Sequence, residues 1–150
     1  MKAELLTIGY EGSVLANVLA ALREAGVEHL VDVRAVPQSR KAGFSRRVLA
    51  ASVEAAGMRY THLRGLGTPK AGREAVRHGD VARMHEIYDA HLRSDAAQAD
   101  LAHAVAIARE DRACLLCFER DHTTCHRDIV AGLIGARTGQ AVRHLVAEGV

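Results

Sequence analysis

Cysteine, histidine and charged side chains are concentrated in one short segment, residues 114–127, which reads Cys-Leu-Leu-Cys-Phe-Glu-Arg-Asp-His-Thr-Thr-Cys-His-Arg. The segment contains all three cysteines of the 150-residue chain. Thiolates act as nucleophiles, redox groups and metal ligands, and nearby charges control their reactivity. An apolar run followed by a polar turn and a helix is how parallel α/β sheets present reactive groups at the carboxyl ends of their strands. The pattern therefore predicts an active or binding site in this segment.

The three cysteines are not equivalent. Residues three apart on a strand point to opposite faces, so Cys114 and Cys117 should not meet, and Cys114 is expected to be a small core residue. Cys125 lies where a helix should begin, and the helix N-terminus with His126 and Arg127 would favour its thiolate. Cys117 and Cys125 are therefore predicted to be nucleophiles or a pair that forms a disulfide. Strand packing and helix capping remain open as the alternative roles.

Metal binding is the second alternative for this segment. Cys117, His122, Cys125 and His126 could supply ligands, but their spacing matches no common ligand set. We therefore predict no metal and no cofactor, and keep a structural metal as a separate hypothesis.

Polar and charged side chains also follow the other predicted strands. Arginine side chains beside a helix N-terminus are suited to bind phosphate or carboxylate groups. Solvated surface ion pairs, which contribute little to stability, are the alternative for these residues. With Arg127, the predicted substrate- or anion-binding set comprises Tyr10, Arg34, Ser39, Arg40, His62 and Arg73, and the predicted catalytic set comprises Cys117, Glu119, Cys125, His126 and Glu11.

Composition limits the class of protein. The chain has 150 residues, of which 49% are hydrophobic and 25% charged. Such a length and composition are typical of one globular domain. Aromatic residues make up 3%, which argues against the stacking platforms that bind single-stranded nucleic acid. The net charge of +2 indicates only a mild basic character. The lack of an 18-residue apolar run, the short apolar start and the odd cysteine count predict a cytoplasmic protein with reduced thiols and no membrane partner.

The hydrophobic pattern alternates between strands and helices, which predicts a single-domain, Rossmann-like α/β fold with a mostly parallel five-stranded sheet and helices on both faces. We predict the strand order 3-2-1-4-5, with ligands at the switch point between strands one and four. Residues 64–73 are expected to form a loop, and Ser13, Ser45 and Ser94 to cap helices. The predicted strands are 5–8, 29–33, 58–63, 112–118 and 141–146, and the predicted helices are 14–25, 46–56, 80–92, 95–110 and 126–137.

Seven blocks of sequence, in order along nearly the whole chain, resemble the DUF488 family, a set of small bacterial and archaeal proteins of unassigned function. The resemblance implies that Cys117 and Cys125 match the two recurrent cysteines of the family, which suggests a redox or thiol-dependent role. The turn Arg120-Asp121-His122 departs slightly from the family pattern. The blocks are Thr7-Ile-Gly-Tyr-Glu-Gly12, Leu30-Val-Asp-Val-Arg34, Pro37-x-Ser39-Arg40, Gly43-Phe44, Tyr60-x-His62-Leu63, Leu66-Gly67-x-Pro69, and Leu115-Leu-Cys117-x-Glu119 continued by Cys125-His-Arg127.

Three functional hypotheses follow from the sequence. The first is an enzyme for a phosphorylated or other anionic small substrate, such as a nucleotide, with a cysteine as nucleophile or redox thiol and with Glu119, Glu11 or His126 as general acid or base. The second is a nucleic-acid or nucleotide binding module without catalysis, and the third is a structural metal-binding protein. The sequence identifies neither the substrate nor the oligomeric state.

Overall fold

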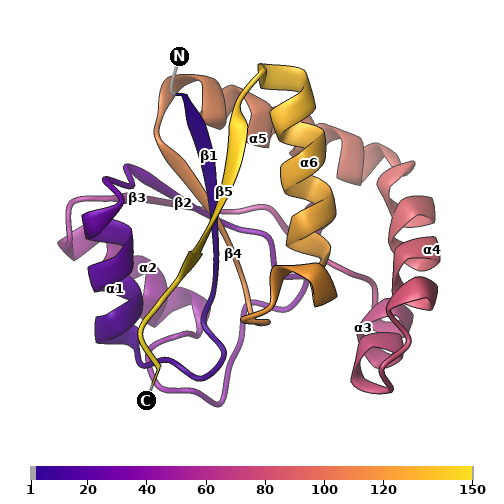
Figure 1. Cartoon of the computed structure of the whole chain (residues 1–150), viewed down its shortest axis with the longest axis horizontal. Helices are drawn as coiled ribbons and strands as arrows, with labels where there is room; N and C mark the ends of the chain where they lie inside the picture. Colours follow the sequence, from indigo (N-terminus) through magenta and orange to yellow (C-terminus); the bar gives the residue numbers. More distant parts are fainter. Residues whose placement is uncertain (1–2, 150) are drawn as a thin grey trace.

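Five apolar runs form the strands of one parallel sheet. The computed structural model describes residues 3–149, and in this part of the chain the five strands lie in the order β3-β2-β4-β1-β5 (Figure 1). The predicted parallel α/β fold is confirmed. The strand bounds are β1 Glu4–Gly9, β2 His29–Asp32, β3 Arg59–His62, β4 Ala113–Cys117 and β5 Ala141–Val146.

The predicted position of β4 in the sheet is wrong. β4 pairs with β2 and with β1, so that Cys114 lies opposite both Leu30 and Leu6. All five β4 residues are buried, because helices cover the strand on both sides. β5, whose residues are mostly exposed or half-buried, lies at the edge beside β1. β1 and β4 are nevertheless neighbours, so the predicted switch point between strands one and four is retained.

Helices cover both faces of the sheet, as predicted. α1 (Leu15–Glu24) and α2 (Arg46–Ala55) pack on one face, while α5 (Asp95–Glu110) and α6 (His126–Thr138) pack on the other. Figure 1 shows α3 (Lys70–Arg77) and α4 (Val81–Leu92) beyond α6, on the side away from α1 and α2. Short 3-10 turns occur at Arg64–Leu66 (η1) and His122–Thr124 (η2). The chain thus leaves β1 and β4 toward helices on opposite faces, while the loops at their carboxyl ends stay hydrogen-bonded to each other, Glu11 N–H donating to the Phe118 carbonyl at 2.8 Å.

The strand alternation places the cysteines as expected. Cys114 packs with Leu116 in the core beneath α1 and α2, whereas Cys117 packs with Leu115 in the core beneath α5 and α6. Cys114 is a free thiol with no exposed surface, and burial raises its pKa. Its predicted role as a core residue is confirmed.

The predicted helix ends are partly confirmed. Gly26 and Gly139 adopt left-handed backbone, with φ of 71° and 78°. A glycine in this conformation ends a helix, here α1 and α6. The Ser94 hydroxyl accepts a hydrogen bond from the Ala97 N–H at 3.2 Å, so Ser94 caps α5. Ser45 is the N-cap of α2 but makes no capping bond through its side chain. The prediction for Ser13 is wrong, because α1 begins one residue later, behind Val14.

The predicted loop at 64–73 is also wrong. It contains η1 and the first turn of α3, which begins behind Pro69. The backbone N–H groups at the start of a helix have no partner within the helix, so proline, which has no N–H, is compatible with that position. No helix in residues 3–149 is long and apolar enough to cross a membrane.

Candidate functional site

A cavity of about 790 Å³ opens at the carboxyl ends of β1, β2 and β4. Its walls come from the loops after these strands, from the neighbouring helices α3 and α4, and from the start of α6. Cys125, His62 and Arg127 are predicted site residues that do not line this cavity. The predicted residues that do line it are Tyr10, Glu11, Arg34, Ser39, Arg40, Arg73, Cys117, Glu119 and His126.

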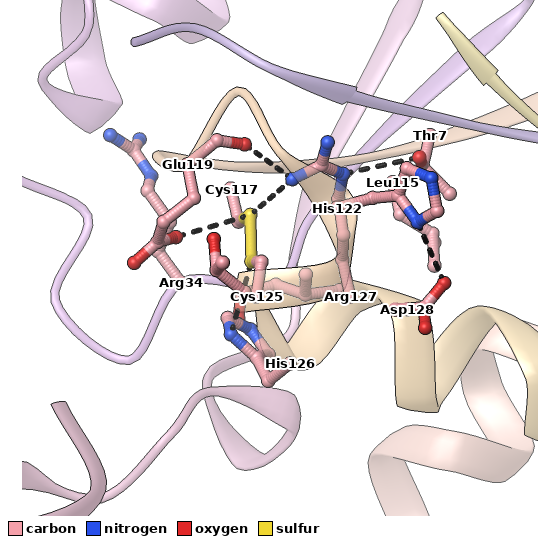
Figure 2. The surroundings of a disulfide bond; sticks show 12 residues. Thr7, Arg34, Leu115, Cys117, Glu119, His122, Cys125, His126, Arg127 and Asp128 are labelled. Carbon is pink, nitrogen blue, oxygen red and sulfur yellow. Dashed lines mark hydrogen bonds and ion pairs between the residues drawn. A yellow bond between two sulfur atoms is a disulfide. The ribbon is translucent and has the colours of Figure 1, made fainter. Parts of the chain in front are cut away.

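Cys117 and Cys125 form a disulfide at the inner wall of the cavity (Figure 2). Cys117 ends β4 and Cys125 immediately precedes α6, and both are buried. The expectation of reduced thiols therefore holds for Cys114 alone. A pair of sulfur atoms joined across one loop can exist as a disulfide or as two thiols, so the site has two redox forms.

The guanidinium of Arg127, which has no exposed surface, lies against this sulfur pair (Figure 2). It donates to Cys117 Sγ at 3.1 Å, to the Glu119 carbonyl at 2.5 Å and to Thr7 Oγ1 at 3.1 Å. A further bond reaches the Arg120 carbonyl at 3.2 Å. Within residues 3–149 no ion pair joins Arg127 to a carboxylate, and burial lowers its pKa. Arg127 therefore faces the sulfur of Cys117 as a buried cation with no carboxylate in direct contact, although the charges of Glu119, Asp128 and Asp121 partly oppose the effect of burial on its pKa.

Arg34 is held differently. Its Nε and one terminal nitrogen form a two-point ion pair with the fully buried Asp32, at 2.9 and 2.7 Å. The other terminal nitrogen donates to Tyr10 Oη at 3.1 Å and to the Phe44 carbonyl at 2.7 Å. Burial opposes the charge of Arg34, but the contacts with Asp32 outweigh this effect and raise its pKa. Arg34 lines the cavity with its charge already neutralised.

Two ionisable groups lie beside the sulfurs, and burial shifts the pKa of each. Glu119 Oε2 lies 3.6 Å from Cys117 Sγ, and burial raises the pKa of this carboxyl group. His126 Nε2 donates to the Val33 carbonyl at 2.7 Å, and its Nδ1 lies 3.6 Å from Cys125 Sγ. In a neutral ring this leaves Nδ1 as the acceptor. Burial lowers the pKa of His126 to about 4. Near pH 7 the imidazole is therefore neutral, and its Nδ1 faces Cys125 as a hydrogen-bond acceptor.

The remaining predicted residues are of two kinds: side chains that hydrogen-bond to the loops, and arginines that form no ion pair within residues 3–149. Glu11 accepts from the Arg120 N–H at 3.0 Å, and His62 donates to the Arg34 carbonyl at 2.7 Å, so both hold loops in place. Ser39 Oγ accepts from the Lys41 N–H. Arg40 is exposed, while Arg73 is half-buried and donates to the Thr68 carbonyl.

Among the residues that line the cavity and were not predicted, a cation and an aromatic ring stand out. Arg77 lies one turn beyond Arg73 on α3. This spacing of four would have paired them if the segment had been recognised as a helix. Phe118, 45% exposed, packs its ring edge-on against Tyr10, with 5.4 Å between the centroids. Arginine side chains and aromatic rings therefore line the same cavity.

Cys117, Glu119 and Cys125 also have the geometry of a metal-ligand set, since one donor atom of each lies within 4.8 Å of the others. The guanidinium of Arg127 contacts the same Cys117 sulfur at 3.1 Å. A cation next to this sulfur repels a metal ion and stabilises a thiolate, so the arrangement favours thiol chemistry.

One comparison with known proteins gives a match. The family model described as "Domain of unknown function DUF488" matches residues 14–134, a range that includes the loops after β2 and β4. No curated protein and no solved structure matches the chain.

Proposed function

Because the chain belongs to the DUF488 family, whose function is unassigned, we propose its activity from the chemistry of the site. The protein is a thiol-dependent enzyme for an anionic small molecule. Cys117 is the attacking thiolate, and Cys125 is the second thiol that releases the product.

The contact between Arg127 and Cys117 carries this proposal. A buried cation without a carboxylate partner is costly unless an anion lies beside it. Cys117 Sγ, 3.1 Å away, becomes that anion once the disulfide is reduced. A cation in this position stabilises the thiolate and so favours the reduced, nucleophilic form of Cys117.

The reaction class is thiol–disulfide exchange with an anionic disulfide. The Cys117 thiolate attacks one substrate sulfur, which forms a mixed disulfide and expels the other sulfur as a thiolate. Glu119, whose pKa is raised, protonates the leaving sulfur. The Glu119 carboxylate left by this step takes the proton of Cys125, whose thiolate attacks Cys117, expels the second substrate thiolate and closes the Cys117–Cys125 disulfide. An external dithiol reduces this disulfide again and is itself oxidised.

Cations that line the cavity favour an anionic substrate. Arg40, Arg73 and Arg77 all line it, and within residues 3–149 none of them forms an ion pair with a carboxylate. An unpaired arginine in a cavity provides donors for a carboxylate or phosphate group.

The test uses reduced protein and an aryl disulfide that carries two carboxylates. The wild-type protein should release both halves of the reagent and end as the Cys117–Cys125 disulfide. The Cys125→Ser variant should release one half and retain the other on Cys117, as seen by mass spectrometry. The Cys114→Ala variant should behave as the wild-type protein does.

Charge recognition is tested by repeating the measurement with a neutral aryl disulfide. Arg73→Gln with Arg77→Gln should slow the reaction with the dicarboxylate reagent and leave the reaction with the neutral reagent unchanged. If Cys117 in the native protein reacts no faster than Cys114, the proposal fails.

Binding of a nucleic acid or nucleotide without catalysis is the second candidate. It is supported by a neighbouring hollow of about 670 Å³ beside the N-terminus of α2, lined by Arg40, Arg46, Arg47, Ser39 and Ser45. Phosphate contacts make affinity fall steeply with salt. Binding of an oligonucleotide at low salt that is lost at high salt and in an Arg46→Gln/Arg47→Gln variant would support it, and no binding at low salt would exclude it.

A further inference from the structure

A second cluster of ionisable side chains lies outside the cavity, on the α6 side of the sheet. Asp128 belongs to the first turn of α6, His122 to η2 and His144 to β5. His122 Nδ1 lies 2.9 Å and His144 Nε2 3.4 Å from the same oxygen, Oδ1 of Asp128. Figure 2 shows His122 and Asp128 joined in this way beside Thr7. Three segments of the chain therefore direct two ring nitrogens toward one carboxylate oxygen.

The donor atoms have the spacing of a metal-ligand set. One atom from each of His122, Asp128 and His144 lies within 4.8 Å of the other two. Two imidazole nitrogens and one carboxylate oxygen are ligands that suit divalent first-row metals such as Zn²⁺. The side chains are 35%, 44% and 22% exposed, which leaves room for a cation to enter and for water to complete its coordination.

His144 also has the outer support that metal-binding histidines usually have. Its Nδ1 lies 2.6 Å from Thr7 Oγ1, its cross-strand neighbour in β1. When Nδ1–H donates to this hydroxyl, the lone pair of Nε2 is directed toward Asp128. Such a bond fixes both the tautomer and the orientation of a ligating ring.

We propose that His122, Asp128 and His144 bind one divalent first-row transition-metal cation, such as Zn²⁺. The two imidazole rings are parallel, with 3.5 Å between their centroids and 4° between their planes. Stacked rings place their in-plane lone pairs side by side rather than at a common point. Binding therefore tilts the rings apart, and the site closes on the cation by small rotations of two side chains.

This site is distinct from the sulfur site. Its ligands include no thiolate, and Thr7 and Arg127 lie between it and Cys117. Its test therefore does not depend on the proposed enzyme activity. Thiolates also bind Zn²⁺, so the experiment removes them with the Cys117→Ser/Cys125→Ser double variant and keeps the rest of the chain intact.

The experiment is calorimetric titration of this metal-free double variant with Zn²⁺, followed by the absorption spectrum with Co²⁺. We expect one cation per chain. Asp128→Asn and His122→Ala should each weaken binding by at least about tenfold, since each removes a ligand. His103→Ala, which changes an exposed histidine on α5, is the matched control and should bind as tightly as its parent.

Nuclear magnetic resonance distinguishes this site from nonspecific binding. Zn²⁺ should shift the ring resonances of His122 and His144 at one equivalent and leave those of His103 unchanged. Circular dichroism of each variant establishes that it is folded before it is compared. The proposal is overturned if Zn²⁺ does not bind, or if Asp128→Asn and His122→Ala bind it as tightly as the parent.

Discussion

Arg34 and Arg127 are both buried beside the site, yet they are compensated in different ways. Arg34 shares two hydrogen bonds with the carboxylate of Asp32, and Tyr60 donates to the same carboxylate at 2.5 Å. Arg127 donates instead to two backbone carbonyls, to Thr7 and to Cys117 Sγ. Asp32 is the carboxylate partner of Arg34, whereas Cys117 can act as a counter-ion only as a thiolate. Arg34 therefore contributes to the stability of the fold, whereas the interactions of Arg127 depend on whether Cys117 is a disulfide, a thiol or a thiolate.

The largest expected effect is at the ion pair between Asp32 and Arg34. Asp32→Asn leaves Arg34 buried without a counter-ion, and we expect the free energy of unfolding to fall by about 3–5 kcal/mol. Urea denaturation measures this change. The double variant Asp32→Leu/Arg34→Met removes both charges and should recover most of the loss. A decrease below about 1 kcal/mol for Asp32→Asn would show that Arg34 does not depend on Asp32.

The pKa of His126 makes the stability of the protein depend on pH. Burial, and then the charge of Arg127, lower its pKa from 6.5 to about 4, so the unfolded chain binds a proton more readily than the folded one. The resulting stabilisation is present above pH 6.5 and is lost as the pH falls toward 4. We expect His126 to account for a loss of about 3 kcal/mol between pH 7 and pH 4.

Unfolding free energies of wild-type and His126→Gln protein at several pH values test this expectation. The variant should lose about 3 kcal/mol less on acidification. His103→Gln, at an exposed site on α5, should retain the wild-type pH dependence. Parallel curves for wild-type and His126→Gln protein would contradict the prediction.

A smaller effect tests the contact between Arg127 and the sulfur directly. In reduced protein with Cys114→Ala and Cys125→Ser, only Cys117 can be alkylated. Arg127→Met should slow its alkylation at pH 7 about tenfold, because loss of the cation lowers the fraction of thiolate; a tenfold change corresponds to about 1.4 kcal/mol.

Arg127→Lys provides the matched control for this measurement. It keeps the charge but loses the planar arrangement of donors, so its rate should lie between those of the other two proteins. Identical pH–rate profiles for all three would mean that Cys117 does not respond to the cation.

The smallest effect is expected at an exposed arginine. Arg59 pairs with Asp111 at 3.0 Å, but its side chain is 73% exposed. Arg59→Ala should change the free energy of unfolding by at most about 1 kcal/mol, and high salt should remove the difference. A loss as large as that of Asp32→Asn would mean that burial does not explain the difference in stabilisation between the Arg34–Asp32 and Arg59–Asp111 ion pairs.

Local features of the sequence predicted much of this arrangement. Strand alternation alone assigned Cys114 and Cys117 to different faces, and both assignments are confirmed. Gly26, Gly139 and Ser94 correctly mark helix ends because their backbone or side-chain chemistry acts within a few residues. Most residues expected at the carboxyl edge line one cavity, since parallel strands place all their following loops on one side.

Features that depend on distant contacts were not predictable in the same way. The position of β4 between β2 and β1 depends on strand pairing, and an apolar run carries little information about its neighbours. Arg34 and Arg127 were expected to bind an anion in the same manner. The sequence places Asp32 two residues before Arg34, but it does not show that Arg127 reaches backbone carbonyls across the loop. His144 meets Asp128 only after β5 has joined β1.

Thr7 connects two parts of the molecule that have been described separately. Its single hydroxyl oxygen lies 2.6 Å from His144 Nδ1 and accepts a hydrogen bond from Arg127 Nε at 3.1 Å. Arg127 in turn donates to Cys117 Sγ. Thermodynamic reciprocity then applies to this chain of contacts. If a cation bound at His144 changes the ionisation constant of Cys117 by some factor, then ionisation of Cys117 changes the affinity for that cation by the same factor.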